Sequence, residues 1–531
     1  MKKGGIIAIV LFVLAGAGGG LVALDVIELP PSINPFNSDD PILYVDRMIL
    51  SIDITGDTTD TLTIDALDKK GIQESFTYNQ TNNHTTITKT DNVITISAQD
   101  TGIDYLNITS ESGITKMITI KVFNPMILEA DSGLLFAYTD QFTHKWDDKD
   151  TGNPFLGNEQ GRFELPEIPA DDIYEGFYPL GCIGRGNWDN PDGIDYGLIV
   201  KDRTNGSLLA PPTDYELFWK AATSEIGGHY SATFWKPIAP KGYVAMGMVV
   251  ETGFVKPSTD LIRCVREDLT VQGKAGAKIW DNELTFHPNS ISFWEIDEPD
   301  NIASDDGHAF LPANTIVGAP SFDSNDYNQT FAHLFDIRLP TYEEFDSWDY
   351  DVKLSDYSSL NDIKPRFSKT VSVPFTIMND NTQGLAWKIE NSPFYFIQRV
   401  ETYKSLDFFD NRQGSEAVTK SISFTTGISE THTETFKEEF GIEVSVEGSI
   451  NLFGPLGKWS VKISNTMSWT TTDSTQYSHV TTSTTQYTVP KGKFGQLLQV
   501  TGSFRLYTAH WDQIGSIPME SEGLKVLEYP L

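Results

Sequence analysis

Residues 442–469 contain two runs of alternating apolar and polar residues on either side of a turn. The first run, Ile442-Glu-Val-Ser-Val-Glu-Gly-Ser-Ile-Asn-Leu452, has an apolar residue or glycine at every even position. After the turn Phe453-Gly-Pro-Leu-Gly457, the apolar residues Trp459, Val461, Ile463, Met467 and Trp469 fall at odd positions. A period of two is typical of a β-strand with one apolar face. The stretch therefore predicts an antiparallel hairpin with Leu452 opposite Trp459.

Each arm of this hairpin has about 11 residues, and a tilted strand that crosses a bilayer needs roughly 9–11. A lone hairpin leaves backbone groups unpaired in lipid, but several copies can close into a barrel. An amphipathic hairpin lying on a soluble core would alternate in the same way. On the membrane interpretation, Glu443, Glu447, Lys458 and Lys462 line the lumen. The residues assigned to the membrane-insertion hairpin are Ile442, Val444, Val446, Ile450, Leu452, Phe453, Leu456, Trp459, Val461, Ile463, Met467 and Trp469.

The segments that flank the hairpin, residues 421–435 and 470–490, are rich in Ser and Thr and prone to form strands. A turn, Val489-Pro-Lys-Gly492, and another strand over 496–504 follow. This order resembles the aerolysin-like β-pore-forming module, over about residues 371–507. The resemblance implies a toxin-like protein that binds a target surface, oligomerises and inserts the hairpin into a lipid membrane. We assign residues 371–531 to this elongated β module.

The composition predicts a mostly β protein of about three domains. Hydrophobic residues make up 39% and aromatic residues 12% of the 531 residues, which is ample for folded cores. The net charge of −34 argues against nucleic acid as a partner, because its binders present basic patches. We expect a homo-oligomer in the active form and a monomer or dimer in the soluble form.

The N-terminal residues have the features of an export signal. Met1-Lys2-Lys3 precedes an uncharged run over residues 4–24, which is either a signal peptide or an N-terminal membrane anchor. We therefore expect a secreted protein or one held at the outer cell surface. Residues 25–41 contain Leu29-Pro-Pro-Ser-Ile-Asn-Pro35 and are interpreted as a stiff linker.

Residues 42–125 contain short alternating runs spaced by about ten residues, with Asp, Asn and Gly at the turns. This spacing predicts a β-sandwich. Its last run, Lys116-Met-Ile-Thr-Ile-Lys-Val122, looks like a strand of the immunoglobulin-like domains of bacterial surface proteins. We expect this immunoglobulin-like sandwich to act as a spacer.

Residues 126–370 are dense in Trp, Tyr, Gly and Asp. The strings Trp235-Lys-Pro-Ile-Ala-Pro-Lys-Gly-Tyr-Val-Ala-Met-Gly247 and Arg263-Cys-Val-Arg-Glu-Asp-Leu-Thr270 closely resemble the vacuolar protein sorting-associated protein 62 family, over about residues 177–270. The resemblance identifies a module without defining its biochemistry.

A weak internal repeat is visible in this central region. Phe-Trp occurs at residues 234–235 and again at 293–294, each time after a strand-like run. We expect a central β-rich domain with a prism-like or trefoil-like arrangement. Aromatic faces beside Asp and Asn can bind sugars, so the candidate surface-binding residues are Trp188, Trp219, Trp235 and Tyr243. Alternatively, these aromatic residues form the cores of small β-layers.

The sequence contains no motif of a metalloprotease, a serine hydrolase or a phosphate-binding loop, so we do not expect an enzyme. We expect no cofactor and assign no metal site, although calcium could bind the acidic stretches 147–152 and 189–195; solvated turns are the alternative. Cys182 and Cys264 are the two cysteines, and in an exported protein they suggest one disulfide; two buried free thiols are the alternative.

Two functions are compatible with these sequence features. The first is a secreted or surface-tethered pore-forming protein whose central domain binds a target surface. The second is a non-toxic cell-surface adhesin or glycan-binding protein on an immunoglobulin-like stalk. A surface glycan or receptor is a candidate partner under both.

Overall fold

The computed structural model describes residues 41–45, 49–55, 58–68, 70, 72–81, 83–151, 160–204, 206–285, 287–300, 305–327, 331–345, 367–428, 430–444, 450–453, 460–463 and 481–529. The chain divides into two compact units, residues 1–123 with 346–364, and residues 124–345 with 365–531. The predicted leader and residues 25–40 of the predicted linker lie outside the described residues. Among the described residues, no helix has the length and apolar character needed to cross a bilayer.

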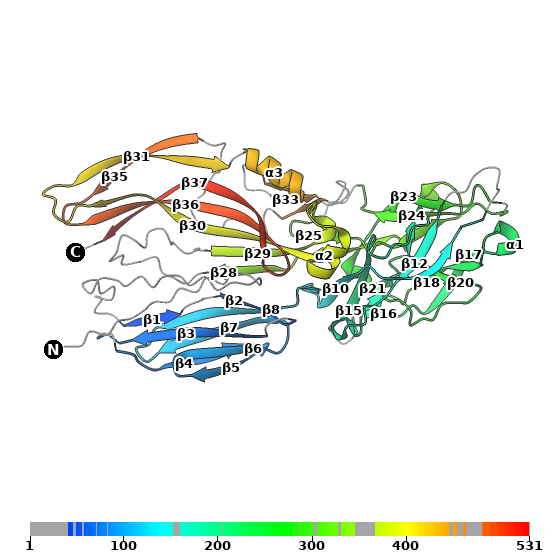
Figure 1. Ribbon diagram of the computed structural model, residues 1–531, viewed down its shortest axis with the longest axis horizontal. Helices are drawn as coiled ribbons and strands as arrows, with labels where there is room; N and C mark the ends of the chain where they lie inside the picture. Colours follow the sequence, from blue (N-terminus) through cyan, green and yellow to red (C-terminus); the bar gives the residue numbers. More distant parts are fainter. Residues whose placement is uncertain are drawn as a thin grey trace. The chain divides into compact units, whose positions relative to one another are not determined.

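The first unit is a sandwich of two four-stranded sheets (Figure 1). One sheet, in spatial order, consists of β1 (Ile42–Val45), β3 (Thr59–Leu67), β6 (Val93–Ala98) and β5 (Thr85–Thr90). The other consists of β2 (Ile49–Asp53), β8 (Thr115–Phe123), β7 (Gly102–Ser110) and β4 (Phe76–Thr81). Alternate residues such as Leu62 and Ile64 in β3 are fully buried, so the apolar faces of both sheets form one core.

The second unit begins with three repeats of six strands. The first repeat contains β10 (Leu134–Thr139), β11 (Phe142–Asp147), β12 (Arg162–Pro166), β13 (Tyr178–Pro179), β14 (Ile183–Arg185) and β15 (Gly197–Asp202), with β9 (Leu128–Glu129) beside β10. The second contains β16 (Leu209–Ala210), β17 (Asp214–Ala221), β18 (Ala232–Ile238), β19 (Tyr243–Val244), β20 (Val249–Thr252) and β21 (Cys264–Arg266). The third contains β22 (Thr270–Gln272), β23 (Lys274–Asp281), β24 (Ser292–Asp297), β25 (His308–Leu311), β26 (Ile316–Ala319) and β27 (His333–Arg338).

All three repeats have the same strand order. The first, sixth and fourth strands form one sheet, and the second, third and fifth strands form another. In the described part of this region, short helices connect or follow these strands, namely η1 (Asp172–Tyr174), α1 (Thr223–Ile226), η2 (Glu267–Leu269) and η3 (Ser324–Asp326). The predicted internal repeat is therefore present in the strand order.

One Trp and one Phe from each repeat meet in a shared aromatic core. The pairs Trp146–Phe163, Trp219–Phe234 and Trp280–Phe293 lie at equivalent ladder positions, each directly after a β-bulge. The ring centres of the three Trp residues lie 5.4 to 6.0 Å apart. Trp146 packs edge-to-face on both Trp219 and Trp280, and contacts of this kind stabilise a core beyond the burial of area alone. The Phe-Trp motif did not reveal the first repeat, because Phe163 is followed by Glu164, whereas Phe234 and Phe293 are each followed by Trp.

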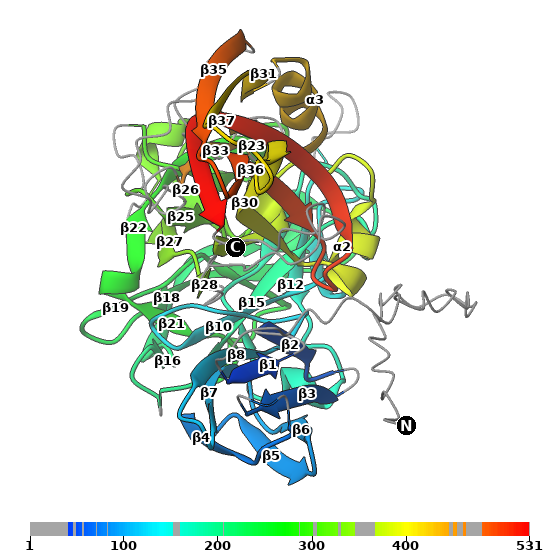
Figure 2. The same ribbon diagram turned by 90° about the vertical axis from the view of Figure 1, so that its left-hand side faces the viewer.

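The C-terminal part of the second unit is a seven-stranded antiparallel sheet. In spatial order it consists of β28 (Thr341–Phe345), β29 (Phe367–Pro374), β30 (Phe394–Asp410), β36 (Phe494–Tyr507), β37 (Gln513–Tyr529), β31 (Val418–Ile428) and β35 (Thr481–Val489). Helices η6 (Phe375–Ile377) and α2 (Leu385–Asn391) connect β29 to β30. Strand β31 pairs with β37 at Gly427 and Ile428 and with β35 along residues 418–426. Figure 2 shows β31 and β35 together at one side of the curved β37.

Candidate functional site

The predicted hairpin folds differently from the two-arm ribbon expected from its sequence. Its described residues form a three-stranded sheet of β32 (Ile442–Val444), β33 (Ile450–Phe453) and β34 (Ser460–Lys462). The predicted first arm is thus two strands, which pair with each other. The predicted pairing of Leu452 with Trp459 is wrong, since Leu452 lies opposite Val461. The alternation of apolar and polar residues specifies which side chains share a face. It does not specify the strand register, because a shift of two residues leaves the same side chains on the same face.

The apolar face of this sheet is buried. Ile442, Ile450, Leu452 and Ile463 are fully buried and Val444 nearly so. They belong to the same core as side chains of the third repeat and of the seven-stranded sheet. A backbone hydrogen bond of 2.8 Å from Gly307 N to Lys462 O joins the end of β34 to the residue before β25. In this form, these five of the side chains assigned to lipid are held in the protein core.

Of the other residues assigned to the hairpin, some are described in the structure and some lie outside the described residues. Glu443 is half-buried, and its hydrogen bond to Lys437, whose Nζ lies 2.5 Å away, lowers the pKa of the carboxyl. Lys462 is exposed, and Phe453 is half-buried with Lys437 Nζ 5.4 Å from its ring centre. Val461 lies in β34. The predicted site residues outside the described part of the chain are Val446, Glu447, Leu456, Lys458, Trp459, Met467 and Trp469.

The strand predicted over residues 421–435 is present as β31 up to Ile428, but the residues from Glu430 to Phe440 form a helix, α3 (Glu430–Phe440). Phe436 and Phe440 lie one helical turn apart and are both buried. Their rings pack against β37 at Gly515, where a Cβ atom would lie 2.7 and 2.8 Å from them. Gly441 ends the helix with φ of 65°, and its N–H donates to the Lys437 carbonyl at 2.9 Å. The contact with a strand 75 residues later in the chain explains why the local Thr-rich sequence misled the prediction.

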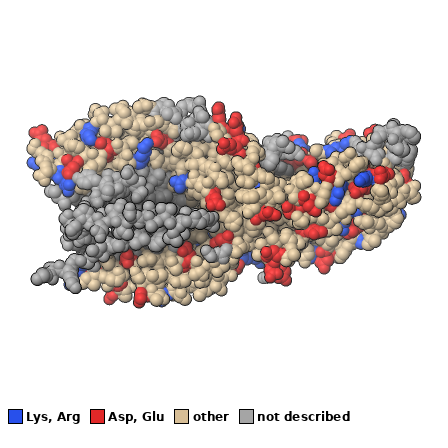
Figure 3. All heavy atoms as spheres, in the orientation of Figure 1, with Lys and Arg blue, Asp and Glu red and all other residues tan. Residues whose placement is uncertain are grey.

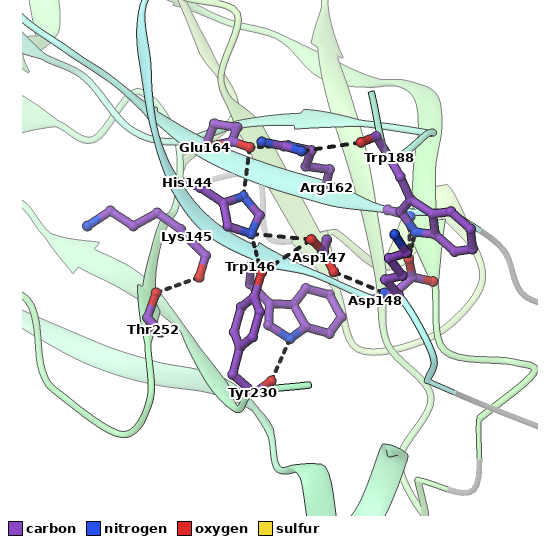
Figure 4. Close-up of polar contacts among 12 residues, drawn as sticks. His144, Lys145, Trp146, Asp147, Asp148, Arg162, Glu164, Trp188, Tyr230 and Thr252 are labelled. Carbon is purple, nitrogen blue, oxygen red and sulfur yellow. Dashed lines mark hydrogen bonds and ion pairs between the residues drawn. The ribbon is translucent and has the colours of Figure 1, made fainter. Parts of the chain in front are cut away.

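A second group of polar and ionisable side chains, of the kinds that occur in functional sites, lies around the first repeat (Figure 4). His144 Nδ1 lies 2.8 Å from Glu164 Oε1, and its Nε2 contacts the Tyr230 hydroxyl and lies 3.3 Å from Asp147 Oδ2. Arg162 pairs with the same oxygen of Glu164 and donates to the Trp188 carbonyl at 3.2 Å. At the equivalent ladder position, the second repeat has Leu217 opposite Trp235. The third repeat has Lys278 opposite Trp294, so the three repeats differ at this position and the His144–Glu164 pair belongs to the first.

This polar network ties the segment around Tyr230 to β11. Burial and the neighbouring Asp147 raise the pKa of Tyr230 to about 12, which keeps its hydroxyl protonated. The carbonyl of Tyr230 accepts a hydrogen bond of 3.2 Å from Trp146 Nε1. Beside it, Thr252 Oγ1 donates to the Lys145 carbonyl at 2.6 Å, which fixes the end of β20 to β11 (Figure 4).

The acidic stretches considered for calcium are engaged in hydrogen bonds. Asp148 accepts from Gly161 N and from the indole N–H groups of Trp188 and Trp280, at 2.7 to 2.8 Å, and burial raises the pKa of its carboxyl. Asp195 accepts from Asn314 at 3.1 Å. Within the described part of the chain, no cluster of His, Cys, Asp and Glu has the arrangement of a metal site.

Two of the four candidate surface-binding aromatics are in fact core residues. Trp219 and Trp235 are only 4% and 9% exposed, so the surface prediction is wrong for both. Trp219 packs in the shared aromatic core, because β17 turns it inward after the bulge. Trp188 and Tyr243 stay partly exposed, and the Tyr243 hydroxyl donates to the Ser207 carbonyl at 3.0 Å.

The predicted disulfide between Cys182 and Cys264 is absent, and both residues are fully buried free thiols. Cys182 Sγ accepts a hydrogen bond from Val250 N at 3.2 Å, next to β14, whereas Cys264 lies opposite Ala210 in the β16–β21 ladder. Cys264 thus belongs to a sheet, whereas Cys182 lies just before β14, and each is part of its local packing. Burial raises the pKa of both thiols to about 12, so neither is a reactive thiolate at neutral pH.

Comparison with known proteins supports both sequence resemblances. Residues 163–307 match the family model of vacuolar protein sorting-associated protein 62, and residues 367–509 match that of the insecticidal crystal toxin P42. The first match contains the predicted range 177–270, and the second contains the range 371–507 assigned to the aerolysin-like module. No curated protein matches the chain at a significant level.

Two solved structures are similar in part. GNIP1Aa from Chromobacterium piscinae shares 21% identity, and the match covers 37% of this chain and 34% of that chain, with a TM-score of 0.30. Cry35Ab1 shares 12% identity, and the match covers 75% of this chain and 90% of that chain, with a TM-score of 0.26. On the family matches, the chain carries a vacuolar protein sorting-associated protein 62 domain followed by an insecticidal crystal toxin P42 domain.

Proposed function

We propose that this protein is a secreted or surface-tethered β-pore-forming protein of the toxin type. In its soluble form the insertion segment, residues 430–480, is stored partly as α3 and the β32–β34 sheet. After the protein binds a target surface and oligomerises, this segment opens into one long hairpin that joins β31 to β35. The match of residues 367–509 to a toxin family supports this proposal.

The observation that carries the proposal is the register of the β31–β35 ladder, in which Val418 lies opposite Val489 and Thr426 opposite Thr481. Continued through the insertion segment, the same register brings Val444 opposite Ile463, Val446 opposite Val461 and Gly448 opposite Trp459. It closes at a two-residue turn, Phe453-Gly454. Apart from Leu456 beside the turn, the apolar positions of the two arms then share one face, as a lipid-facing surface requires.

In this hairpin the opposite face is polar and lines the lumen. Lys462 lies opposite Ser445, with Glu443 and Glu447 as its diagonal neighbours on the other arm. Two acids, Glu443 and Glu447, and two bases, Lys458 and Lys462, cancel in each subunit. We therefore expect this ring of charges to give the pore little ion selectivity.

The conversion exchanges one apolar environment for another. The buried side chains of the β32–β34 sheet leave the protein core and enter hydrocarbon, and each is worth about 1.5–3 kcal/mol when withdrawn from water in either place. The net driving force therefore comes from barrel closure, which pairs every backbone group of the hairpins. Helix α3 must unwind at the same time, because residues 430–440 precede the lipid-facing stretch in the first arm.

A disulfide staple tests this conversion. Glu443 and Asn451 lie opposite each other in the β32–β33 ladder and are both half-exposed. In the opened hairpin they lie on one strand, roughly 26 Å apart at 3.3 Å per residue. We expect oxidised E443C/N451C to release no dye from lipid vesicles and the reduced protein to release it as the wild type does.

The matched control is the single variant E443C under the same oxidising conditions, which forms no staple within the chain. Equal dye release by the oxidised and reduced forms of E443C/N451C would contradict the proposal, because the segment would then act without opening. Absence of release by the wild-type protein on every membrane that it binds would also contradict it.

A further inference from the structure

Strands β31 and β35 form a two-stranded ribbon that packs on the rest of the seven-stranded sheet (Figure 2). Residues 418–426 of β31 pair with residues 481–489 of β35. Among the described residues, β31 pairs with β37 only at Gly427 and Ile428. We call residues 418–426 with 481–489 the strap. A two-stranded ribbon is marginally stable alone in water, so contacts made by its side chains must hold the strap on the sheet.

The two faces of the strap differ in composition. One face is exposed and carries only Ser, Thr and Gln side chains. On this face, hydrogen bonds between the strands join Thr419 to Thr488 at 2.8 Å and Ser423 to Thr484 at 3.0 Å. The other face packs on side chains of β30, β36 and β37. The residues of this contact are Ile422, Tyr487 and Val489 of the strap, with Leu406, Phe409, Leu497 and Leu524 of the sheet.

Polar side chains of the sheet reach the strap at two places. Gln499 Nε2 on β36 donates to the Thr425 carbonyl at 2.7 Å. Asp407 Oδ2 on β30 accepts a hydrogen bond of 2.6 Å from the Tyr487 hydroxyl and lies 2.5 Å from Lys420 Nζ. Lys420 and Tyr487 lie directly opposite each other in the strap, so one carboxylate oxygen joins both of its strands to β30. We call Asp407, Lys420 and Tyr487 the clasp.

The clasp contains an ionised carboxylate. Burial acts to raise the pKa of Asp407, but the hydrogen bonds from Lys420 and Tyr487 outweigh this effect, and the pKa lies below its ordinary value. Burial and the hydrogen bond to Asp407 raise the pKa of Tyr487, so its hydroxyl stays protonated. At neutral pH Asp407 therefore accepts hydrogen bonds from both partners. Hydrogen bonds to an ionised group are stronger than those between neutral groups.

The base of the strap is attached separately. Asn411, between β30 and β31, is buried. Its side-chain amide donates to the carbonyls of Glu416, Val489 and Pro490 at 2.9 to 3.1 Å. These hydrogen bonds join the turn before β31 to the turn after β35. Asn411 therefore fixes the base of the strap independently of the clasp.

An ion pair suits a contact that has to open. Replacing a buried ion pair by apolar side chains of similar volume is often neutral or stabilising, because the charged groups lose hydration when they pair. The side chains of Asp407 and Lys420 are only 19% and 29% exposed, and both regain water when the strap leaves the sheet. This part of the contact therefore opens without exposing apolar area.

We propose that the clasp holds the strap on the sheet in the soluble form. Its release lets the strap turn about Asn411, away from the sheet, before the insertion segment opens. This inference rests on the proposed pore-forming function, since the strap contains the two strands that the opened hairpin continues. It adds a step that controls when the hairpin forms.

Hydrogen–deuterium exchange of the soluble protein tests the clasp without a membrane. The variant D407A removes both contacts of the clasp, and we expect the amides of the strap to exchange about threefold to tenfold faster. Y487F removes one of the two contacts and should give a smaller change in the same direction. The matched control is K404A, which breaks the 2.7 Å ion pair between Lys404 of β30 and Glu520 of β37. This control should leave exchange in the strap unchanged.

A general effect of charge does not explain the expected result for D407A. The chain carries a net charge of −34, and acidic side chains are widespread on the face shown in Figure 3. Removal of one carboxylate therefore changes the overall electrostatics little, and the effect of D407A is local to the clasp.

Dye release from lipid vesicles separates this inference from the proposed function. D407A should release dye faster than the wild type, and K404A should release it at the wild-type rate. If the strap of D407A and of Y487F exchanges at the wild-type rate, the clasp is wrong whatever the pore activity. If exchange in D407A is faster but dye release is unchanged, the clasp does not control opening and the proposed step is wrong. If the wild type releases no dye from any membrane that it binds, the proposed function fails, while the exchange rates still decide whether the clasp holds the strap.

Discussion

Ile442 and Leu452 lie opposite each other in the β32–β33 ladder, and both side chains are fully buried in the core of the second unit. Both belong to the face that would contact lipid in the proposed pore. The same two residues therefore stabilise the soluble form and the membrane form. A change at either position acts on the balance between the two forms as well as on the pore.

The substitution Leu452→Ala should lower the free energy of unfolding of the soluble form by about 2–5 kcal/mol, since it leaves a cavity in a packed core. Opening of the segment then costs less, and dye release should begin at a lower temperature than in the wild type. Thermal unfolding and vesicle leakage measured across temperature check both effects. Lys462→Ala, on the exposed side of the same sheet, is the control. If the Leu452→Ala variant is less stable but dye release begins at the same temperature as in the wild type, opening of the segment does not control pore formation.

The substitution Gly515→Ala should loosen helix α3. Its Cβ atom would collide with the rings of Phe436 and Phe440, and overpacking of this kind costs about 1–3 kcal/mol. We expect faster proteolytic cleavage within residues 430–440 and faster dye release. Gly384→Ala is the matched control, because nothing lies within 4 Å of a Cβ atom at that position. Equal cleavage rates in the two variants would show that packing at Gly515 does not hold the helix.

The alternation of apolar residues allowed some of this site to be predicted. It placed Ile442, Val444, Ile450 and Leu452 on one apolar face, and all four side chains are buried in the structure. It could not give the partner of each strand, because several registers keep the same side chains on the same face. The helix at 430–440 depends on Gly515, far away in the chain, and no local pattern contains that contact.

Aromatic residues were harder to interpret than strands. Phe-Trp pairs indicated a repeat correctly, yet the same pattern gave no measure of exposure for Trp219 or Trp235. Exposure depends on the β-bulges that turn one side chain of each repeat inward, and a bulge has no simple sequence signature.

The stability of the protein should depend on pH through Glu298. Burial, together with the neighbouring Asp297, raises the pKa of Glu298 to about 7, from an ordinary value of 4.5. Between these two values the folded form binds more protons than the unfolded form, so ionisation of Glu298 destabilises the fold as the pH rises from about 4.5 to 7. The variant E298Q should therefore have a higher thermal midpoint than the wild type at pH 8 and nearly the same midpoint at pH 4. A difference in thermal midpoint between E298Q and the wild type that stays the same from pH 4 to pH 8 would exclude such a role for Glu298.

The register of the inserted hairpin can be measured by cross-linking. In the soluble form Lys462 lies opposite Asn451, so N451C/K462C should form a disulfide in solution. In the proposed hairpin Lys462 lies opposite Ser445, so S445C/K462C should form a disulfide within each subunit of membrane-bound oligomers. Asn451 then lies six residues farther along the strand than Ser445, and N451C/K462C should lose its cross-link in the same oligomers. A cross-link that persists in membrane-bound N451C/K462C would mean that the β33–β34 pairing survives insertion, and the continuous ladder from β31 to β35 would be wrong.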